Sequence, residues 1–436
     1  MLWLAAPPVR SPDKTRPWLA LGLAAFLVAC GNKPSGASTS TASEAPSAEV
    51  SASASSLVPA LPARANDDPK GAGVSKFVAA TSKESECQAA TAELATYLMR
   101  GDLGLAGRPT EKGGEFATSY LIQLRGKAQI GFAGYDGAAK RFSRDRGIGS
   151  AHEHAPRLFA TADKWTVAWF DDDGLAYAHP TWDSTEKPLV EHMSTLKNVK
   201  PADVALAATP EGPLVVASPF GTAGDQLSLF LFAPIAEGQK KRAIGVTRIA
   251  KKPSSPAVLG DKTGYSVAWL EEDGQVLTAR FDLEGKEIGL GTVAVGKPGK
   301  RSSLAMTQLD GGPLLTWEQD GQIFGRMLDA GANPDGDLWL IGKGTQPAVA
   351  GFGESAVVAF LAEVEGVAEQ LVAVRVAKTG VSESAIRVSE ARTPVLDRPA
   401  VALGGPRIAF VWTEKMGPAI SSKRAWIRTL DSACLK

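Results

Sequence analysis

The sequence lacks an excess of charge of either sign, because its 436 residues include 47 basic and 47 acidic side chains. A protein that wraps nucleic acid usually carries a basic excess, since its affinity comes from neutralising phosphates. The short basic clusters at residues 240–242 and 251–252 are typical of solvated turns. We therefore expect no nucleic-acid partner.

The familiar motifs of catalysis are also missing. No Gly-x-Ser-x-Gly motif is present, so nothing indicates a nucleophilic serine. Residues 291–297 have the spacing of a P-loop, but Pro298 stands where a Ser or Thr must hold Mg²⁺. We expect no cofactor and assign no catalytic residue, and the sequence leaves open whether the protein is an enzyme.

Histidine is scarce, and all four copies lie between residues 152 and 192. His152 and His154 alternate, so both imidazoles share one face if the segment is extended. Divalent ions accept imidazole readily. No further ligand lies at a recognisable spacing, so these two residues are weak metal candidates and no metal site is assigned.

Three acidic segments resemble cation ligands at first sight. Residues 171–173 and 271–273 occupy matched positions before a glycine, and we interpret them as turns. Residues 333–337 resemble the start of a calcium loop, but no Glu follows at the spacing of an EF-hand.

The apolar run near the N-terminus, residues 18–27, is too short to cross a bilayer as a helix. It follows a positively charged stretch and leads into Leu27, Val28, Ala29 and Cys30. Those residue types match the bacterial lipobox, so residues 16–31 resemble a bacterial lipoprotein signal. The resemblance implies that residues 1–29 are a signal peptide and that Cys30 is acylated and anchors an exported protein.

The residue after the cysteine bears on the destination of the lipoprotein. Gly31 stands where an Asp would favour retention in the inner membrane. The outer membrane, on its periplasmic or its surface face, is therefore the preferred location.

A segment rich in Ser, Ala and Pro follows, at residues 30–73. It contains few large apolar side chains, so it cannot bury enough surface to offset its chain entropy. We expect a disordered tether between the membrane and a folded domain.

The rest of the chain contains an internal repeat. In three stretches an apolar strand ends in Trp, an acidic turn with Asp-Gly follows, and a second strand alternates in polarity. Asp-Gly between two such strands predicts a hairpin. Including weaker copies, the equivalent positions are 37 to 52 residues apart: Phe132, Trp169, Ala217, Trp269, Trp317, Phe360 and Trp412.

Units of this length with three or four strands are typical of propeller blades. The pattern resembles the Trp-containing β-propeller repeats of large bacterial exported proteins, which implies an all-β fold. We expect seven blades of four antiparallel strands over residues 113–436, with the repeated Trp side chains packed between blades. Solenoids and tandem immunoglobulin-like sandwiches are the alternatives, although the latter need about 100 residues per unit.

The last predicted unit is one strand short. An open sheet edge leaves backbone groups unpaired, so we expect an N-terminal strand at residues 74–80 to complete it. The remainder of residues 74–112 should hold a short helix at residues 85–100, where Ser85 and Gln88 form a capping-box pattern and Leu94, Tyr97 and Leu98 share a face.

Two cysteines remain after Cys30, one near each end of the folded part. In an oxidising compartment such thiols tend to pair, so we expect a disulfide between Cys87 and Cys434. It would close a loop of about 350 residues. Chain-entropy models give such a link up to about 5 kcal/mol of stabilisation.

The function that these features favour is a monomeric, non-catalytic binding platform for an envelope protein or a glycan. Fold and missing motifs are a weak basis for function, so two alternatives stay open. One is a hydrolase or lyase with a site in the central channel, and the other is a structural spacer in an envelope assembly.

Lipid attachment at Cys30 predicts that processing needs the lipoprotein signal peptidase. Globomycin treatment should leave unprocessed precursor, visible as a larger band on a gel. Normal processing in the presence of the inhibitor would contradict the lipid anchor.

Overall fold

The computed structural model describes residues 68–435 except 80–88, 99–102, 112, 125–126, 144–145, 151–155, 162–163, 183–187, 194–203, 210–211, 221–225, 233–242, 295–300, 390–393 and 418–419. All of them belong to one unit, Val50–Lys436, whereas the unit Met1–Glu49 lies outside the described residues. The described part contains strands β1 to β30 and one turn of 3-10 helix, η3 (Ser432–Cys434), but no α-helix.

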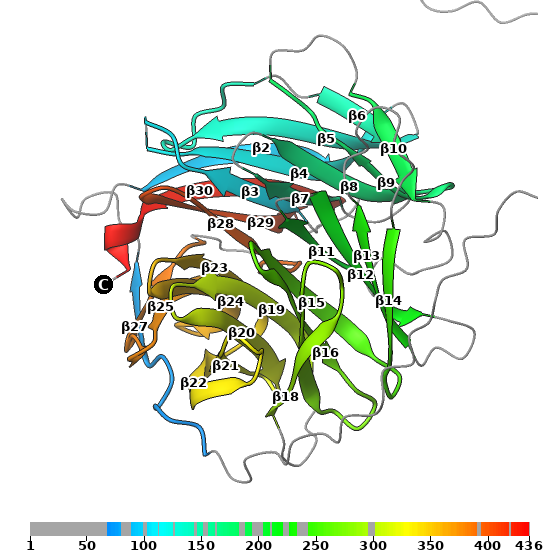
Figure 1. Ribbon diagram of the computed structural model, residues 1–436. Helices are drawn as coiled ribbons and strands as arrows, with labels where there is room; N and C mark the ends of the chain where they lie inside the picture. Colours follow the sequence, from blue (N-terminus) through cyan, green and yellow to red (C-terminus); the bar gives the residue numbers. More distant parts are fainter. Residues whose placement is uncertain are drawn as a thin grey trace, which may run out of the picture. The chain divides into compact units, whose positions relative to one another are not determined.

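Four of the sheets have four antiparallel strands in sequence order (Figure 1). They are β7 (Arg157–Ala160), β8 (Trp165–Asp171), β9 (Gly174–Ala178) and β10 (Val190–Met193); β11 (Val204–Thr209), β12 (Gly212–Phe220), β13 (Gln226–Phe232) and β14 (Ala243–Ile249); β15 (Ser254–Asp261), β16 (Gly264–Leu270), β17 (Val276–Phe281) and β18 (Glu287–Ala294); and β19 (Arg301–Leu309), β20 (Gly312–Gln319), β21 (Gln322–Leu328) and β22 (Pro334–Lys343).

Two larger sheets complete the fold. The six-stranded sheet contains β23 (Thr345–Phe352), β24 (Ser355–Val364), β25 (Val367–Ala377), β26 (Gly380–Val381), β27 (Ser384–Arg387) and β1 (Lys76–Ala79). The eight-stranded sheet contains β28 (Ala400–Gly404), β29 (Arg407–Gly417), β30 (Ile420–Asp431), β2 (Ala90–Leu98), β3 (Gly104–Arg108), β4 (Glu115–Leu124), β5 (Lys127–Asp136) and β6 (Arg146–Ser150).

The sheets are the blades of a β-propeller, because the first strand of each repeat unit lies beside the first strand of the next. These innermost strands follow one another as β3, β7, β11, β15, β19, β23 and β28, and β28 lies beside β3 again. The predicted all-β propeller with four-stranded units is therefore confirmed.

The predicted count of seven blades is corrected to six, because the eight-stranded sheet supplies two of the seven innermost strands, β28 and β3. Two of the predicted units, those around Phe132 and Trp412, belong to one sheet of eight strands. The reason is the pairing of Leu98 in β2 with Ile122 in β4, which joins the two groups of strands.

The predicted helix at residues 85–100 is wrong. Residues 90–98 form β2, which pairs antiparallel with β30 from Ala90 opposite Thr429 to Leu98 opposite Lys423. Leu94 and Leu98 are both 3% exposed and pack in the same core cluster. A spacing of four residues suits one face of a helix and one face of a strand equally, so it did not distinguish the two. Ser85 and Gln88 lie outside the described residues.

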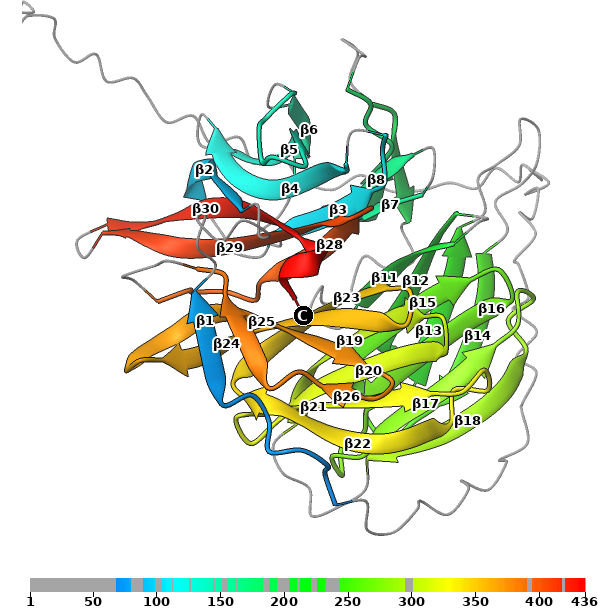
Figure 2. The same cartoon turned by 90° about the vertical axis from the view of Figure 1, so that its left-hand side faces the viewer.

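An N-terminal strand completes the C-terminal group of strands, as expected, but it is β2 and not residues 74–80. Strand β1 instead pairs parallel with β27 and so belongs to the six-stranded sheet, beside which Figure 2 shows it. Just before β1, Lys70 and Val74 donate backbone hydrogen bonds to Leu338 and Ile341 in β22. The segment from Lys70 to Ala79 therefore runs along the outer strands of two neighbouring sheets.

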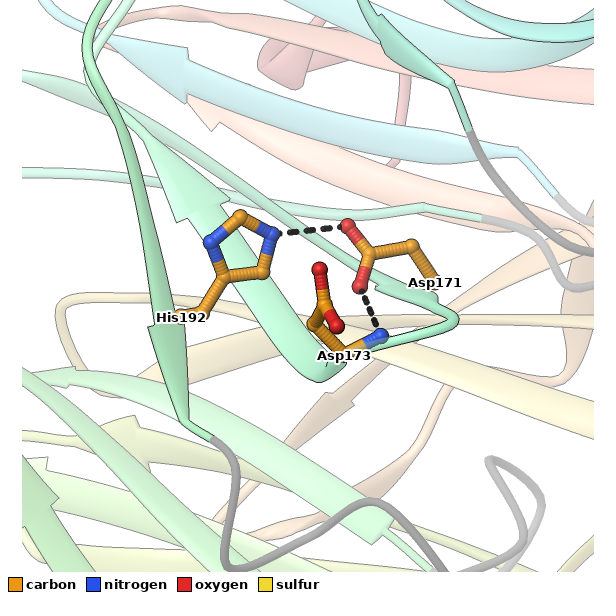
Figure 3. Close-up of side chains that lie close together, drawn as sticks. All are labelled: Asp171, Asp173 and His192. Atoms are coloured by element: carbon orange, nitrogen blue, oxygen red, sulfur yellow. Dashed lines mark hydrogen bonds and ion pairs between the residues drawn. The ribbon is translucent and has the colours of Figure 1, made fainter.

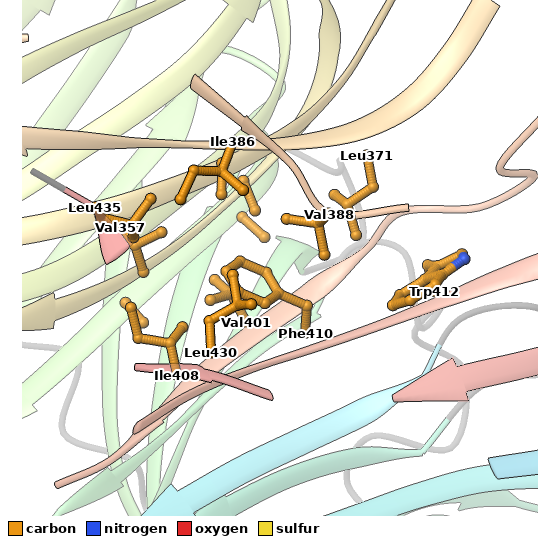
Figure 4. Packing of buried hydrophobic residues seen from close by; sticks show 14 of the residues in the cluster. Val357, Leu371, Ile386, Val388, Val401, Ile408, Phe410, Trp412, Leu430 and Leu435 are labelled. Atoms are coloured by element: carbon orange, nitrogen blue, oxygen red, sulfur yellow. The ribbon is translucent and has the colours of Figure 1, made fainter. Parts of the chain in front are cut away.

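The repeated tryptophans are core residues. Trp169, Trp269, Trp317 and Trp412 are at most 3% exposed and lie in the second strand of their group or close to its end. Trp269, for example, packs with Val216 and Leu227 of the preceding sheet. Figure 4 shows Trp412 and Phe410 in the core with side chains of the β23–β27 sheet. The predicted role of these residues in packing between blades is confirmed.

The Asp-Gly turns also form as predicted. Gly274 and Gly321 follow the second strand of their sheets with φ of +81° and +72°. A residue with a β-carbon is strained at such a positive φ. This is why a glycine follows the acidic residues of each turn. No helix among the described residues is long and apolar enough to cross a bilayer.

Completion of the sheet by β2 predicts that this strand is essential to stability. Leu94→Ala should lower the free energy of unfolding by about 2–5 kcal/mol, because it leaves a cavity in a buried cluster. Thr91→Ala, at an exposed position of the same strand, should cost less than about 1 kcal/mol. Urea unfolding of both variants measures the difference, and equal midpoints would contradict the role of β2.

The disulfide between Cys87 and Cys434 stays a prediction. Cys434 is partly buried in η3 beside the core and is not a free thiol, but Cys87 lies outside the described residues. Peptide mapping without reduction should give one peptide that joins the two cysteines. Two separately alkylated cysteines would contradict the pairing.

Candidate functional site

Most of the residues singled out from the sequence lie outside the described part of the chain. These are Cys30, Cys87, His152 and His154. Of the two other histidines, His179 is bonded to Thr166, with 3.0 Å between its Nδ1 and the Thr166 Oγ1. His192 lies in β10 and joins a group of carboxylates.

The acidic turn at residues 271–273 is neutralised by basic side chains. Lys252 forms an ion pair with Glu272, and Lys251 Nζ lies 3.9 Å from Asp273 Oδ2. Asp273 Oδ1 also accepts a hydrogen bond from the backbone of Gln275. The interpretation of this segment as turn chemistry fits these contacts.

The segment that resembles a calcium loop, residues 333–337, likewise forms hydrogen bonds and ion pairs with its neighbours. Its first residue, Asn333, donates its backbone N–H to Oδ1 of Asp329, which precedes the segment and also accepts the N–H of Gly331, closing the turn between β21 and β22. Asp337 forms an ion pair with Lys70 at 2.8 Å. Neither carboxylate is directed into a shared ligand set.

The matched turn between β8 and β9 is different, because a histidine faces it. We call Asp171, Asp173 and His192 the carboxylate–imidazole group; one ligand atom from each lies within 4.8 Å of the other two. Asp171 Oδ2 is 2.9 Å from His192 Nε2, and Asp171 Oδ1 accepts a hydrogen bond of 3.0 Å from the backbone of Asp173. Figure 3 shows the three side chains directed toward one another.

The strand that carries His192 is fixed by its neighbour. In β10, Glu191 lies opposite Tyr177 of β9, and the Tyr177 hydroxyl donates a 2.7 Å hydrogen bond to Glu191 Oε2. Burial, and then the hydrogen bond and charge of Glu191, raise the pKa of Tyr177 well above its usual value. The phenol therefore stays protonated and holds β10 in register.

A second group lies between the β3–β6 strands and the β7–β10 sheet. We call Phe132, Phe142, Trp165 and Trp182 the Trp182 cluster. Trp182 stacks on Phe132 with ring centroids 4.6 Å apart, meets Phe142 edge-on at 5.2 Å, and lies 5.7 Å from Trp165. Phe142 is 47% exposed, so the cluster reaches the surface.

A charged pair borders the Trp182 cluster. Arg108 Nε donates a 2.8 Å hydrogen bond to Glu115 Oε2, and the indole N–H of Trp182 donates to Glu115 Oε1. The Arg108 guanidinium also lies over the Trp165 ring, 4.5 Å from its centroid. Aromatic surface and hydrogen-bonding groups thus converge at one place.

Sequence reasoning missed this cluster, although one signal was present. Trp182 follows β9 and lies off the repeated Trp position, so the repeat did not account for it. Its partners come from β3, β4, β5 and β8, and no linear motif joins them.

No protein-family model and no curated protein matches the chain. Among solved structures, Aleuria aurantia lectin in complex with alpha-methyl-L-fucoside is 13% identical, with a TM-score of 0.43 over 69% of this chain and 99% of that chain. The WD40 domain of SCAP from fission yeast is 10% identical, with a TM-score of 0.45 over 79% of this chain and 98% of that chain. Trypanosoma rangeli sialidase is 10% identical, with a TM-score of 0.37 over 75% of this chain and 55% of that chain. At these values none of them assigns a function to this chain.

Proposed function

We propose that this protein is an exported lipoprotein, anchored to the outer membrane through Cys30, whose β-propeller is a binding platform. Its partner is an envelope glycan or protein, and the Trp182 cluster with Arg108 and Glu115 is the recognition surface. The observation that carries the proposal is the exposed Phe142 ring, which packs on Trp182, the indole that donates to Glu115.

The chemistry of this surface favours a glycan over a protein. A sugar ring presents apolar C–H groups on one face, which pack on an exposed aromatic ring, and hydroxyl groups around its edge. Those hydroxyls both donate and accept, and the partly exposed Arg108 side chain supplies N–H donors, while Glu115 holds Arg108 and Trp182 in place. Among the described contacts of Arg108, only Nε is used in a hydrogen bond.

The rigidity of the cluster supports a binding role. Glu115 is held by Arg108 and by the Trp182 indole, and Trp182 is packed against three other rings. A surface that is already ordered loses little conformational entropy when it binds, so weak contacts suffice for measurable affinity.

The innermost strands give little support to the alternative of a hydrolase or lyase in the channel. Their described residues are mostly small or apolar, and the one carboxylate among them is Asp261 in β15. Asp261 is bonded to Arg280 at 2.7 Å. Burial opposes the charged form, but the bonds from Arg280 and Thr263 lower the pKa of Asp261 to about 2. Such a carboxylate is poorly suited to take up a proton near neutral pH.

If the protein binds a glycan through this surface, substitutions in the surface should reduce the binding signal on a glycan array. Phe142→Ala should weaken binding by about tenfold or more, because hot spots centre on aromatic and arginine side chains. Arg108→Gln should weaken binding as well, by removing the charged donor. The full-length protein in detergent is the sample for each measurement.

Ile288→Ala is the matched control, since Ile288 is an exposed apolar residue (55%) in another sheet. It should leave glycan binding unchanged. Equal binding by the wild type and both site variants would refute the proposed surface. Capture of an envelope protein without any glycan signal would replace the glycan with a protein partner.

A further inference from the structure

We propose that Asp171, Asp173 and His192 form a binding site for a divalent transition-metal ion, with Zn²⁺ as its best-fitting occupant. The site lies at the turn between β8 and β9 and is distinct from the Trp182 cluster. It is therefore independent of the proposed function.

The sheet brings the histidine to the carboxylates by strand pairing. His192 in β10 lies opposite Ala176 in β9, and Asp171 in β8 lies opposite Gly174. Cross-strand partners share a face of the sheet. Because Ala176 and Gly174 carry no bulky side chain, the imidazole extends over β9 and reaches Asp171.

The turn orients the first carboxylate. Asp171 Oδ1 is occupied by the backbone N–H of Asp173, at 3.0 Å. That bond leaves Oδ2 directed at His192 Nε2, 2.9 Å away. Asp173 follows two residues later, and its exposed carboxylate lies within 4.8 Å of both other ligand atoms.

These separations suit a small cation. Zinc binds imidazole nitrogen and carboxylate oxygen at about 2.0–2.2 Å, so two ligand atoms of a tetrahedral site are about 3.3–3.6 Å apart. Asp171 Oδ2 and His192 Nε2 lie 2.9 Å apart, so they would separate by about half an ångström as the ion replaces the proton between them. The exposed Asp173 carboxylate would rotate to complete the set. A site with an imidazole ligand does not prefer Mg²⁺ or Ca²⁺, because these ions favour oxygen ligands alone.

The matched turn in another sheet differs in the partners of its acidic side chains. At residues 271–273 the acidic side chains have Lys251 and Lys252 as partners. Among the described residues, the partner of Asp171 is instead His192, which does not supply the fixed positive charge of a lysine. Two carboxylates and an imidazole thus lie together at this turn, and these are ligand types that a divalent transition-metal ion accepts.

Three protein ligands leave further coordination positions open. Since Asp173 and His192 are exposed, water or a group from a binding partner has access to those positions. The proposed ion is thus available for recognition at the surface, and it would also fasten β10 to the turn of β8 and β9.

Calorimetric titration of the full-length protein with ZnCl₂ tests the site. We expect one ion per chain, and Mn²⁺ and Ca²⁺ should bind more weakly. His192→Ala should weaken Zn²⁺ binding by at least about tenfold, the lower range for loss of a group that supports a metal site. Asp171→Asn should do the same; its side chain keeps an acceptor for the Asp173 N–H, so the turn still forms.

Matched controls separate this site from other histidines and turns. His179→Ala removes the histidine that directly follows β9, and Glu272→Gln removes an acid from the matched turn; neither should change Zn²⁺ affinity. The double variant His152→Ala, His154→Ala should bind as the wild type does. The absence of binding, unchanged binding by His192→Ala and Asp171→Asn, or binding that depends on His152 and His154 would each overturn the proposal.

Discussion

The antiparallel pairing of β2 with β30 is the interaction on which the rest of this fold depends. It joins residues 90–98 to residues 423–429, so the strands from β3 to β29 lie within the loop that this pairing closes. Without β2, the edge of β30 would expose unpaired backbone groups, and the link from Leu98 to Ile122 in the first group of strands would be lost. The entropy of closing so long a loop grows only slowly with its length, by about 0.6 kcal/mol per doubling, so burial of Leu94 and Leu98 can offset it.

The same closure explains why both ends of the described chain matter although neither carries the candidate sites. Cys434 lies in η3, directly after β30, and the predicted partner Cys87 lies shortly before β2 in the sequence. A disulfide between these two cysteines would reinforce the pairing of β2 with β30, which closes the fold. Strand β1 adds a separate attachment on β27, and the Lys70 segment adds another on β22. The N-terminal region thus contacts three sheets before the first complete group of strands begins.

The parts of the fold that could be predicted from the sequence are those set by local chemistry. Gly274 and Gly321 marked hairpins because a left-handed turn needs glycine, and Trp269 marked a core position because it recurs in units of similar length. Strand β2 could not be predicted, because Leu94 and Leu98 satisfy either periodicity and the choice is made by a partner more than 300 residues away. The candidate sites were hidden for the same reason. Asp171 was interpreted as a turn residue, and its hydrogen bond from the Asp173 backbone agrees with that interpretation. Its second oxygen contacts His192, however, and only the pairing of β9 with β10 brings that histidine close.

Departures from the internal repeat are where function is to be sought in such a fold. A residue that recurs at one position in many sheets, such as the buried Trp, is explained by packing that every sheet needs. The β7–β10 sheet departs from that pattern twice. Its acidic turn is paired with His192, whereas the matched turn of the β15–β18 sheet has lysine partners. The connection between β9 and β10 also carries Trp182, an indole outside the repeated position. Packing alone requires neither change, because the other sheets form without them. Both candidate sites therefore involve the sheet whose sequence departs from the shared pattern, and this coincidence makes it the first place to look for a partner.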